Sequence, residues 1–239
     1  MHYDPMDLAD FIARRRAELR ALGLVVETRR DFETLYDLEI PGKALSPMFS
    51  PRHYDLLDEK ARWICGRMGG EIVHVQAVRL IDAGEASVER ALGCEFARLF
   101  GKPSYPPGRI ADALEAMGGR AVYHGDLWCH ARLRGTGAGE RLGALGVALA
   151  MLTFDPQHIF GFMEQPLAGK GFFFREGYFN IEPLGPGWRR GAPFLLETDW
   201  LVYAGREALR KLVARDAQLN RVRQAATCLE PSVIGNTSR

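Results

Sequence analysis

Residues 121–145 read AVYHGDLWCHARLRGTGAGERLGAL, and this stretch decides the fold. Apolar and aromatic residues between Ala121 and Cys129 predict a strand, and Leu142 and Leu145 begin the apolar face of a helix. Between strand and helix stand three glycines at alternate positions, Gly135, Gly137 and Gly139. At such a junction, free backbone N–H groups and the positive end of the helix dipole can hold a phosphate group.

Two well-known phosphate loops do not fit this segment. A dinucleotide fingerprint, GxGxxG, would require glycine where the chain has Glu140 or Leu142. A P-loop would require Ser or Thr after Gly169-Lys170, where the chain has Gly171. The segment could also be a tight turn between strand and helix that binds no ligand.

Composition sets the broad class of protein. The chain has 239 residues, 47% of them hydrophobic and 26% charged, which is typical of a folded globular protein with a sizeable core. Lys and Arg total 31 and Asp and Glu total 30, so the net charge is +1. This balance offers no electrostatic support for binding nucleic acid or an anionic membrane, and we expect neither as a partner.

The chain carries no signal for a membrane or for the secretory route. No apolar run approaches the ~18 residues of a transmembrane helix, and the N-terminus is polar and acidic. The four cysteines stand far apart without a CxxC pair: Cys65, Cys94, Cys129 and Cys228. We therefore expect a cytoplasmic protein without disulfides and without a metal site.

Apolar spacing and turn residues predict the other elements. In the N-terminal half we expect an amphipathic helix over 8–22, a strand over 24–28, a helix over 31–40 with Asp31 as N-cap, a loop over 41–51 and a helix over 51–60. Strands over 62–68 and 71–82, joined by Gly69-Gly70, make the strongest hairpin signal. A pair of helices, broken at 103–108, is expected over 84–119.

The C-terminal half continues with alternating short elements. We expect a strand over 158–163, a short aromatic helix containing Phe172, Phe173 and Phe174 that ends at Gly177, strands over 178–184 and 194–203, and an exposed helix over 206–226 before a mobile tail. The predicted organisation is an N-terminal helix at 1–23, one α/β domain at 24–205 with the helical insert at about 84–119, and a C-terminal helix and tail at 206–239.

The loop fits the pattern Arg-x-x-Gly-x-Gly, counted from Arg134, and with it the chain resembles the GNAT superfamily of acyl-CoA N-acyltransferases. Arg132 also satisfies the pattern, but the positions of Leu142 and Leu145 favour Arg134. The hairpin, the strand ending at Cys129, the strand ending at Met163 and the segment FFFREGY at 172–178 follow in the order of that family. The resemblance covers about residues 24–205, apart from the insert.

The resemblance implies a fold and a cofactor. The fold would be an α/β (α+β) structure with a mixed, mainly antiparallel sheet flanked by helices and a helical insert before the cofactor-binding strand. The strands bearing Cys129 and Met163 would part, and acyl-CoA, acetyl-CoA above all, would lie between them. The cofactor-binding residues implied are Cys129, His130 and Ala131 for pantetheine, and Arg134, Gly135, Thr136, Gly137, Ala138, Gly139 and Glu140 for the pyrophosphate.

Acyl transfer to an amine requires a neutral amine, hydrogen-bond donors for the thioester oxyanion and a route for the leaving thiolate. Asp126 is the first candidate for the base and His124 the second. Tyr123, His130 and Glu164 stand nearby, and each of these side chains also has a purely structural interpretation.

One position departs from the family resemblance. GNAT proteins commonly carry a tyrosine four residues before the glycine matched by Gly177, where it protonates the thiolate, and this chain has Phe173. A thiol with a pKa of ~8.5 leaves reasonably well as thiolate, and Tyr178 is a candidate substitute.

The predicted activity is transfer of an acyl group, acetyl first, from acyl-CoA to a primary amine, with a small-molecule acceptor favoured over a protein. Two alternatives stay open: a non-catalytic acyl-CoA-binding module of the same fold, and a transferase for longer acyl chains. The insert either covers the acceptor pocket or is a packing or dimer element. The apolar terminal strands would allow a homodimer paired at the sheet edge.

Overall fold

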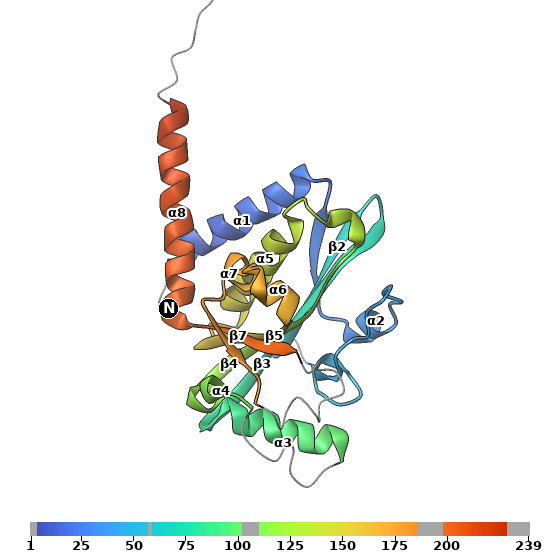
Figure 1. The fold of residues 1–239 in the computed structure, drawn as a ribbon. Coiled ribbons are helices and arrows are strands. Elements are labelled where there is room, and N and C mark those ends of the chain that lie inside the picture. Colours follow the sequence, from blue (N-terminus) through green and yellow to red (C-terminus); the bar gives the residue numbers. More distant parts are fainter. Residues whose placement is uncertain (1–3, 57–58, 102–109, 186–197, 229–239) are drawn as a thin grey trace, which may run out of the picture.

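The computed structural model describes residues 4–56, 59–101, 110–185 and 198–228, and its core is one sheet of seven strands (Figure 1). The strand order is β1-β2-β3-β4-β5-β7-β6, and all neighbours are antiparallel except β4 and β5, which are parallel. The predicted mixed, mainly antiparallel sheet is confirmed. The strands are β1 (Val25–Arg29), β2 (Ala61–Met68), β3 (Glu71–Ser87), β4 (Gly118–Cys129), β5 (His158–Glu164), β6 (Asn180–Pro183) and β7 (Asp199–Gly205).

Helices cover both faces of the sheet (Figure 1). Successive strand residues point to opposite faces, so Ala121 and Tyr123 join one buried cluster and Val122 another. The first face carries α2 (Phe32–Tyr36), α3 (Val88–Phe100), α4 (Asp112–Ala116) and the 3-10 turn η1 (Pro47–Phe49). The second carries α1 (Pro5–Ala21), α5 (Ala138–Phe154), α6 (Gln165–Gly169), α7 (Phe172–Glu176) and α8 (Arg206–Cys228), and the 3-10 turn η2 (Ala131–Leu133) links β4 to α5.

The hairpin between β2 and β3 forms as predicted. Gly69 and Gly70 have φ angles of 59° and 88°, the left-handed values that a two-residue type I′ turn requires. The two strands pair from Met68 and Glu71 back to Ala61 and Arg79.

Two expectations for the N-terminal third are wrong. Residues 51–56 form turns instead of the predicted helix, and α2 ends at Tyr36, well before residue 40. Tyr54 packs beneath the guanidinium of Arg79, whose carbon lies 4.1 Å from the ring centroid, so tertiary packing overrides the local helical signal. Asp31 is the N-cap residue of α2, but its side chain makes no capping hydrogen bond.

The helical insert lies between β3 and β4 and is shorter than expected. β3 continues to Ser87 and β4 begins at Gly118, so the insert comprises α3 and α4, and the predicted break at 103–108 lies outside the described residues. The Ser87 side chain accepts a hydrogen bond from the Arg90 N–H and so caps α3. Val88, Leu92 and Phe96 pack on the first face of the sheet.

The C-terminal elements follow the prediction with two changes. β6 and β7 are shorter than expected, the stretch 186–197 lies outside the described residues, and the short helix α6 was not predicted. The last helix is not exposed on all sides, because Leu209, Val213 and Ala217 are buried. The predicted tail at 229–239 also lies outside the described part of the chain.

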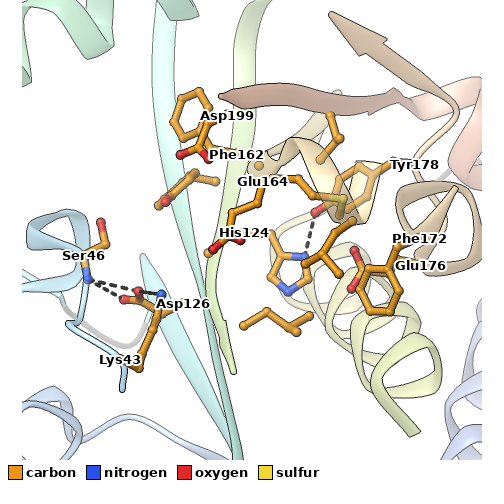
Figure 2. Close-up of a pocket in the computed structure, with 17 residues that line it drawn as sticks. Lys43, Ser46, His124, Asp126, Phe162, Glu164, Phe172, Glu176, Tyr178 and Asp199 are labelled. Carbon is orange, nitrogen blue, oxygen red and sulfur yellow. Dashed lines mark hydrogen bonds and ion pairs between the residues drawn. The ribbon is translucent and has the colours of Figure 1, made fainter. Parts of the chain in front are cut away.

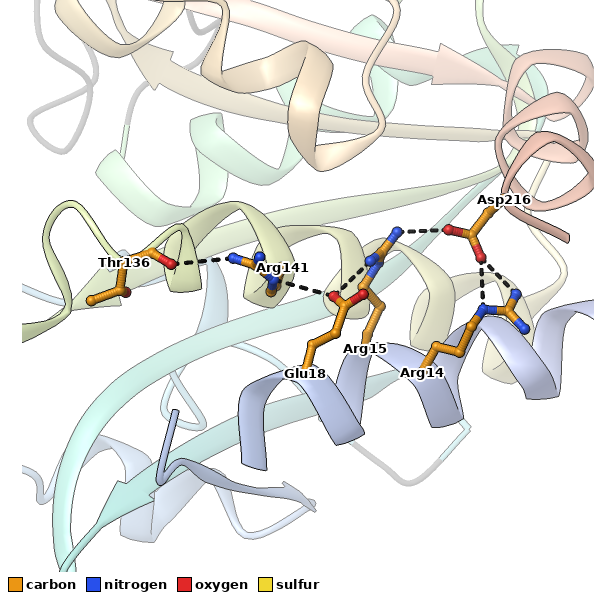
Figure 3. Close-up of polar contacts among 6 residues, drawn as sticks. All are labelled: Arg14, Arg15, Glu18, Thr136, Arg141 and Asp216. Carbon is orange, nitrogen blue, oxygen red and sulfur yellow. Dashed lines mark hydrogen bonds and ion pairs between the residues drawn. The ribbon is translucent and has the colours of Figure 1, made fainter. Parts of the chain in front are cut away.

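A chain of ion pairs joins α8, α1 and α5 (Figure 3). Asp216 of α8 accepts hydrogen bonds from Arg14 (2.6 Å) and Arg15 (2.7 Å) of α1. Arg15 also donates to Glu18 (2.7 Å), which accepts from Arg141 of α5 (3.2 Å). These carboxylates hold the guanidinium groups of three arginines at one helix junction.

Asp216→Asn is expected to lower the free energy of unfolding by about 1 kcal/mol, or roughly 2–4 °C in Tm, because Arg14 and Arg15 lose the negative charge between them. Thermal unfolding followed by circular dichroism measures the change. Glu27→Gln, an exposed change on β1, serves as the control and should leave the Tm unaltered. Equal Tm values for all three proteins would contradict a stabilising role for this ion-pair chain.

Candidate functional site

The candidate site opens where β4 and β5 part (Figure 2). Their parallel pairing extends only from Ala121–His158 to Tyr123–Phe160 and then stops, although both strands continue. Beyond Tyr123, the backbone groups of β4 that face β5 have no strand partner, and a pocket occupies the gap. The parting of the two strands that the family resemblance implied is confirmed.

A bulge in β4 shapes one wall of this pocket. Ala77 of β3 pairs with Gly125 and Val75 pairs with Trp128, so β4 carries one residue more than β3 across this interval. Asp126 stands in the bulge with a φ of 52°, in the left-handed region that Asp tolerates better than most residues.

The carboxylate of Asp126 anchors the segment that closes this side of the pocket (Figure 2). It accepts hydrogen bonds from the Ser46 N–H at 3.0 and 3.1 Å and pairs with Lys43 Nζ at 3.0 Å. Burial raises the pKa of Asp126, while Lys43 and the Ser46 N–H oppose this rise. A carboxylate offers about four acceptor positions, so these three contacts leave room for one more.

His124 and Tyr178 meet in the pocket, as Figure 2 shows, with His124 Nδ1 and the Tyr178 hydroxyl 2.7 Å apart. Gln76 determines which ring nitrogen carries the proton. Its Nε2 donates to the carbonyl oxygen of Leu142 (2.8 Å), so its Oε1 faces His124 Nε2 (2.7 Å) as an acceptor. His124 therefore donates through Nε2 and accepts the Tyr178 O–H at Nδ1.

Both members of this pair are neutral at pH 7. Burial lowers the pKa of His124 to about 4. Burial, with the nearby Glu176 adding to it, raises the pKa of Tyr178 well above its ordinary value. Both His124 and Tyr178 line the pocket.

The glycine loop lies at the N-terminus of α5. Gly135 and Gly137 have φ angles of 74° and 72°, which explains why glycine occupies both positions. Ala138 N–H donates to Thr136 Oγ1 (3.2 Å) and Arg141 N–H donates to the carbonyl oxygen of Gly137 (3.4 Å). The remaining N–H groups of the first turn of a helix have no intrahelical acceptor, which leaves them open to an anion.

Basic side chains surround this loop without covering it. Arg134 is exposed, and Arg141 donates from its guanidinium to the Thr136 carbonyl oxygen (3.2 Å). Arg175 of α7 pairs with Glu140 (2.5 Å). Arg132, the alternative start of the loop pattern, instead pairs with Glu71 of the hairpin (2.7 Å).

The predicted site residues fall into two groups. Asp126, His124 and Tyr178 line one pocket, and the loop residues from Arg134 to Glu140 sit at the head of α5. Of the segment assigned to pantetheine, Cys129 ends β4, Ala131 begins η2, and the His130 N–H donates to the carbonyl oxygen of Val73 on β3 (2.8 Å). The His130 N–H therefore points away from the gap between the strands.

Several residues of the pocket were not predicted. Among them are Lys43, Ser46 and Glu176, which line it, and Gln76, which orients His124. Gln76 had a signal in the sequence, because it is a polar residue inside the apolar run from Val73 to Val78. The other three had none, since loop lysines and serines and a glutamate at a helix end are common on protein surfaces.

The insert does not line this pocket in the described part of the chain. The lining residues come from the 43–46 segment, β4, β5, α6, α7, Tyr178 and β7. Neither α3 nor α4 contributes a lining residue, so the expectation that the insert covers the pocket is not met by the described residues.

The described residues form neither a metal-binding cluster nor a membrane-spanning helix. Among the described residues, no group of three or more His, Cys, Asp or Glu side chains is arranged to hold a metal ion. Within the same residues, no helix has the length and apolar character needed to span a membrane. The described cysteines, Cys65, Cys94 and Cys129, are free thiols.

Comparison with solved structures finds GNAT proteins. A GNAT family acetyltransferase from Elizabethkingia anophelis with acetyl-CoA bound is 8% identical, with a TM-score of 0.40 over 77% of this chain and 98% of that one. An N-acyl amino acid synthase from uncultured soil microbes is 8% identical, with a TM-score of 0.40 over 87% and 90%. An IAA acetyltransferase from Bacillus cereus is 12% identical, with a TM-score of 0.39 over 76% and 99%.

No protein-family model and no curated protein matches the chain by sequence. The chain is thus similar to structures of the GNAT family, as the resemblance of its loop and strand order predicted.

Gly146→Ala is expected to destabilise the protein by about 1–3 kcal/mol, because a Cβ there would clash with Gln76 Oε1 and lie 3.0 Å from His124 Nε2. In an open helix the same substitution would stabilise by roughly 1 kcal/mol. Gly169→Ala in α6 is the matched control, since no atom lies within 4 Å of the added carbon. Urea denaturation that shows both variants at or above wild-type stability would contradict the packing of this pair against α5.

Proposed function

We propose that this protein transfers an acyl group from acyl-CoA to an amine. The observation that carries the proposal is the parting of β4 and β5 directly beside the exposed glycine loop at the head of α5. The loop offers N–H groups and a helix dipole to a pyrophosphate. The gap offers unpaired strand edges to the amide groups of a pantetheine arm, which would end at the pocket.

The proposal includes the acyl donor, the acceptor and the residues that would bind acyl-CoA. Acetyl-CoA is the first candidate donor, and a small molecule with a primary amine is the expected acceptor. The pyrophosphate would bind Arg134, Gly135, Thr136, Gly137, Ala138, Gly139 and Glu140, and the pantetheine would lie along Cys129, His130 and Ala131. Because the N–H of His130 bonds to Val73, pantetheine would pair with the backbone groups of its neighbours in the gap.

Asp126 is the base that the geometry favours over His124. Asp126 retains an open acceptor position, whereas His124 uses both ring nitrogens and its pKa is lowered to about 4. An amine must lose a proton as it attacks the thioester, and Asp126 would take that proton directly or through one water molecule. His124 would then keep Tyr178 in place.

Gly135→Asp tests the loop. Asp tolerates the φ of 74°, and no atom lies within 4 Å of the added carbon, so the fold should be retained while a negative charge enters the anion site. Saturating acetyl-CoA, at about 100 times its Kd, should stabilise the wild type by about 2.7 kcal/mol and this variant far less.

The control for the loop variant is Gly101→Asp, at a positive φ of 63° with the same open surroundings but on the opposite face of the sheet. It should keep the full thermal shift with acetyl-CoA and CoA, and neither NAD nor ATP should shift any of the three proteins. A wild type that acetyl-CoA does not stabilise would mean that the loop is only a turn.

Asp126→Asn tests the base. Asn also tolerates the left-handed backbone, so the variant should keep its acetyl-CoA shift and lose about 100-fold or more in kcat for thiol release with a panel of primary amines. His124→Gln, which removes the partner of Tyr178, should reduce kcat less. A larger loss in His124→Gln than in Asp126→Asn would reverse the two roles, and acetyl-CoA binding without thiol release by the wild type would favour the non-catalytic binding module.

A further inference from the structure

The proposed acyl transfer assigns no role to the buried carboxyl group of Glu176. Glu176, the last residue of α7, is 2% exposed and lines the same pocket as His124 and Tyr178 (Figure 2). Its Oε1 has no hydrogen-bond partner among the residues that the structure describes. Buried carboxyl groups are normally paired, so an unpaired one that faces a pocket points to a ligand.

Three glycines of α5 make room for this carboxyl and place it along the pocket. They lie on one face of the helix, one turn apart. Gly139 lies against Phe172, Gly143 against the Glu176 carboxyl, and Gly146 against Gln76 and His124. A Cβ on Gly143 would overlap Glu176 Oε1. Glu176 therefore sits midway between the glycine loop and the His124–Tyr178 pair, along the route proposed for pantetheine.

The surroundings favour the protonated form of Glu176. Burial raises its pKa well above the ordinary value, and Glu140 of α5 raises it further, while Arg175 of α7 lowers it. Arg175 pairs with Glu140 and also donates to the carbonyl oxygen of Lys170, and Glu176 Oε1 receives no hydrogen bond from it. The other titratable groups coupled to this carboxyl are Cys129 of β4 and Tyr178, and Glu176 raises the pKa of both.

The neighbouring groups are poorer proton donors. The Tyr178 hydroxyl already donates to His124 Nδ1, and burial raises the pKa of the Cys129 thiol to about 12. Phe173 and Phe172 carry no proton to give. Glu176 is thus a buried acid with an uncommitted oxygen beside the proposed path of the thioester.

We propose that Glu176 protonates the thiolate that leaves acyl-CoA, a role that rests on the proposed function. The amine nitrogen forms a bond to the acyl carbon, the carbon–sulfur bond breaks, and its electron pair goes to sulfur. Sulfur takes the proton of Glu176 and leaves as the thiol of CoA. The proton lost by the amine passes to Asp126 and then to water, and Glu176 regains a proton from water after the thiol departs.

The test compares wild type with Glu176→Gln and Glu176→Leu, using acetyl-CoA and the amine of the panel that gives the fastest thiol release. Both variants should keep the thermal shift and the KM for acetyl-CoA and lose about 100-fold in kcat, because each lacks the proton. Glu176→Leu is the second variant because an apolar side chain leaves no buried polar group without a partner, so this variant should stay folded. Glu27→Gln, exposed on β1, is the control and should match the wild type.

The pH profile separates proton donation from a packing role. A donor must be protonated, so the kcat of the wild type should fall as pH rises through the pKa of Glu176, and both variants should lack that fall. The role of Glu176 as proton donor is overturned if the kcat of both variants stays within about twofold of the wild-type value. It is also overturned if the kcat of the variants still falls at alkaline pH. A wild type that binds acetyl-CoA but releases no thiol overturns it too, and one that does not bind acetyl-CoA overturns the proposed function as well.

Discussion

The site depends on a single interruption of backbone hydrogen bonding. β4 and β5 are the only parallel neighbours among the described strands, and they pair over three residues before they part. Strands that diverge expose polar backbone edges, which a folded protein ordinarily covers or pairs. Here the gap is lined by the 43–46 segment, α6 and α7 and left accessible as a pocket, so the unpaired edges are available to a ligand.

Polar side chains enter this gap only because small residues admit them. Gly143 and Gly146 of α5 leave space for Glu176 and for the Gln76–His124 contact, and Gly161 of β5 approaches the backbone of His124 closely. An added Cβ at any of these positions would displace a polar group or the neighbouring strand. The close packing of helix and strands thus determines which side chains reach the pocket and which oxygen atoms stay unpaired.

The titratable side chains on the two sides of the pocket have different electrostatic environments. On one side, the carboxylate of Asp126 points to Lys43 and the Ser46 N–H, which favour its charged form and oppose the rise in pKa that burial causes. On the other side, His124, Tyr178 and Glu176 are neutral because burial opposes their charged forms. The proposed roles of Asp126 as base and Glu176 as proton donor rest on this difference, because acyl transfer from a thioester to an amine requires one of each.

Local sequence patterns were sufficient to predict the elements that are bounded by glycine turns. Gly69-Gly70 between two apolar runs predicts the hairpin, and the order of strand, glycine loop and helix at 121–145 predicts the head of α5, because these features depend on residues adjacent in sequence. The family resemblance placed His124, Asp126 and Tyr178 among the candidates, but it did not predict their contacts. The helix expected over 51–60 failed because Tyr54 packs under Arg79, a residue 25 positions away.

Tertiary structure decided what each candidate side chain can do. Asp126 accepts hydrogen bonds from Ser46, a residue 80 positions earlier in the chain. His124 contacts Gln76 of β3 and Tyr178, which follows α7. Glu176 packs against the glycines of α5, and its Oε1 has no hydrogen-bond partner among the described residues. Burial, and with it the protonation state of each group, arises only when these distant segments pack together. Neighbours in sequence set the type of each element, and the removal of water by packing sets the chemistry of the site.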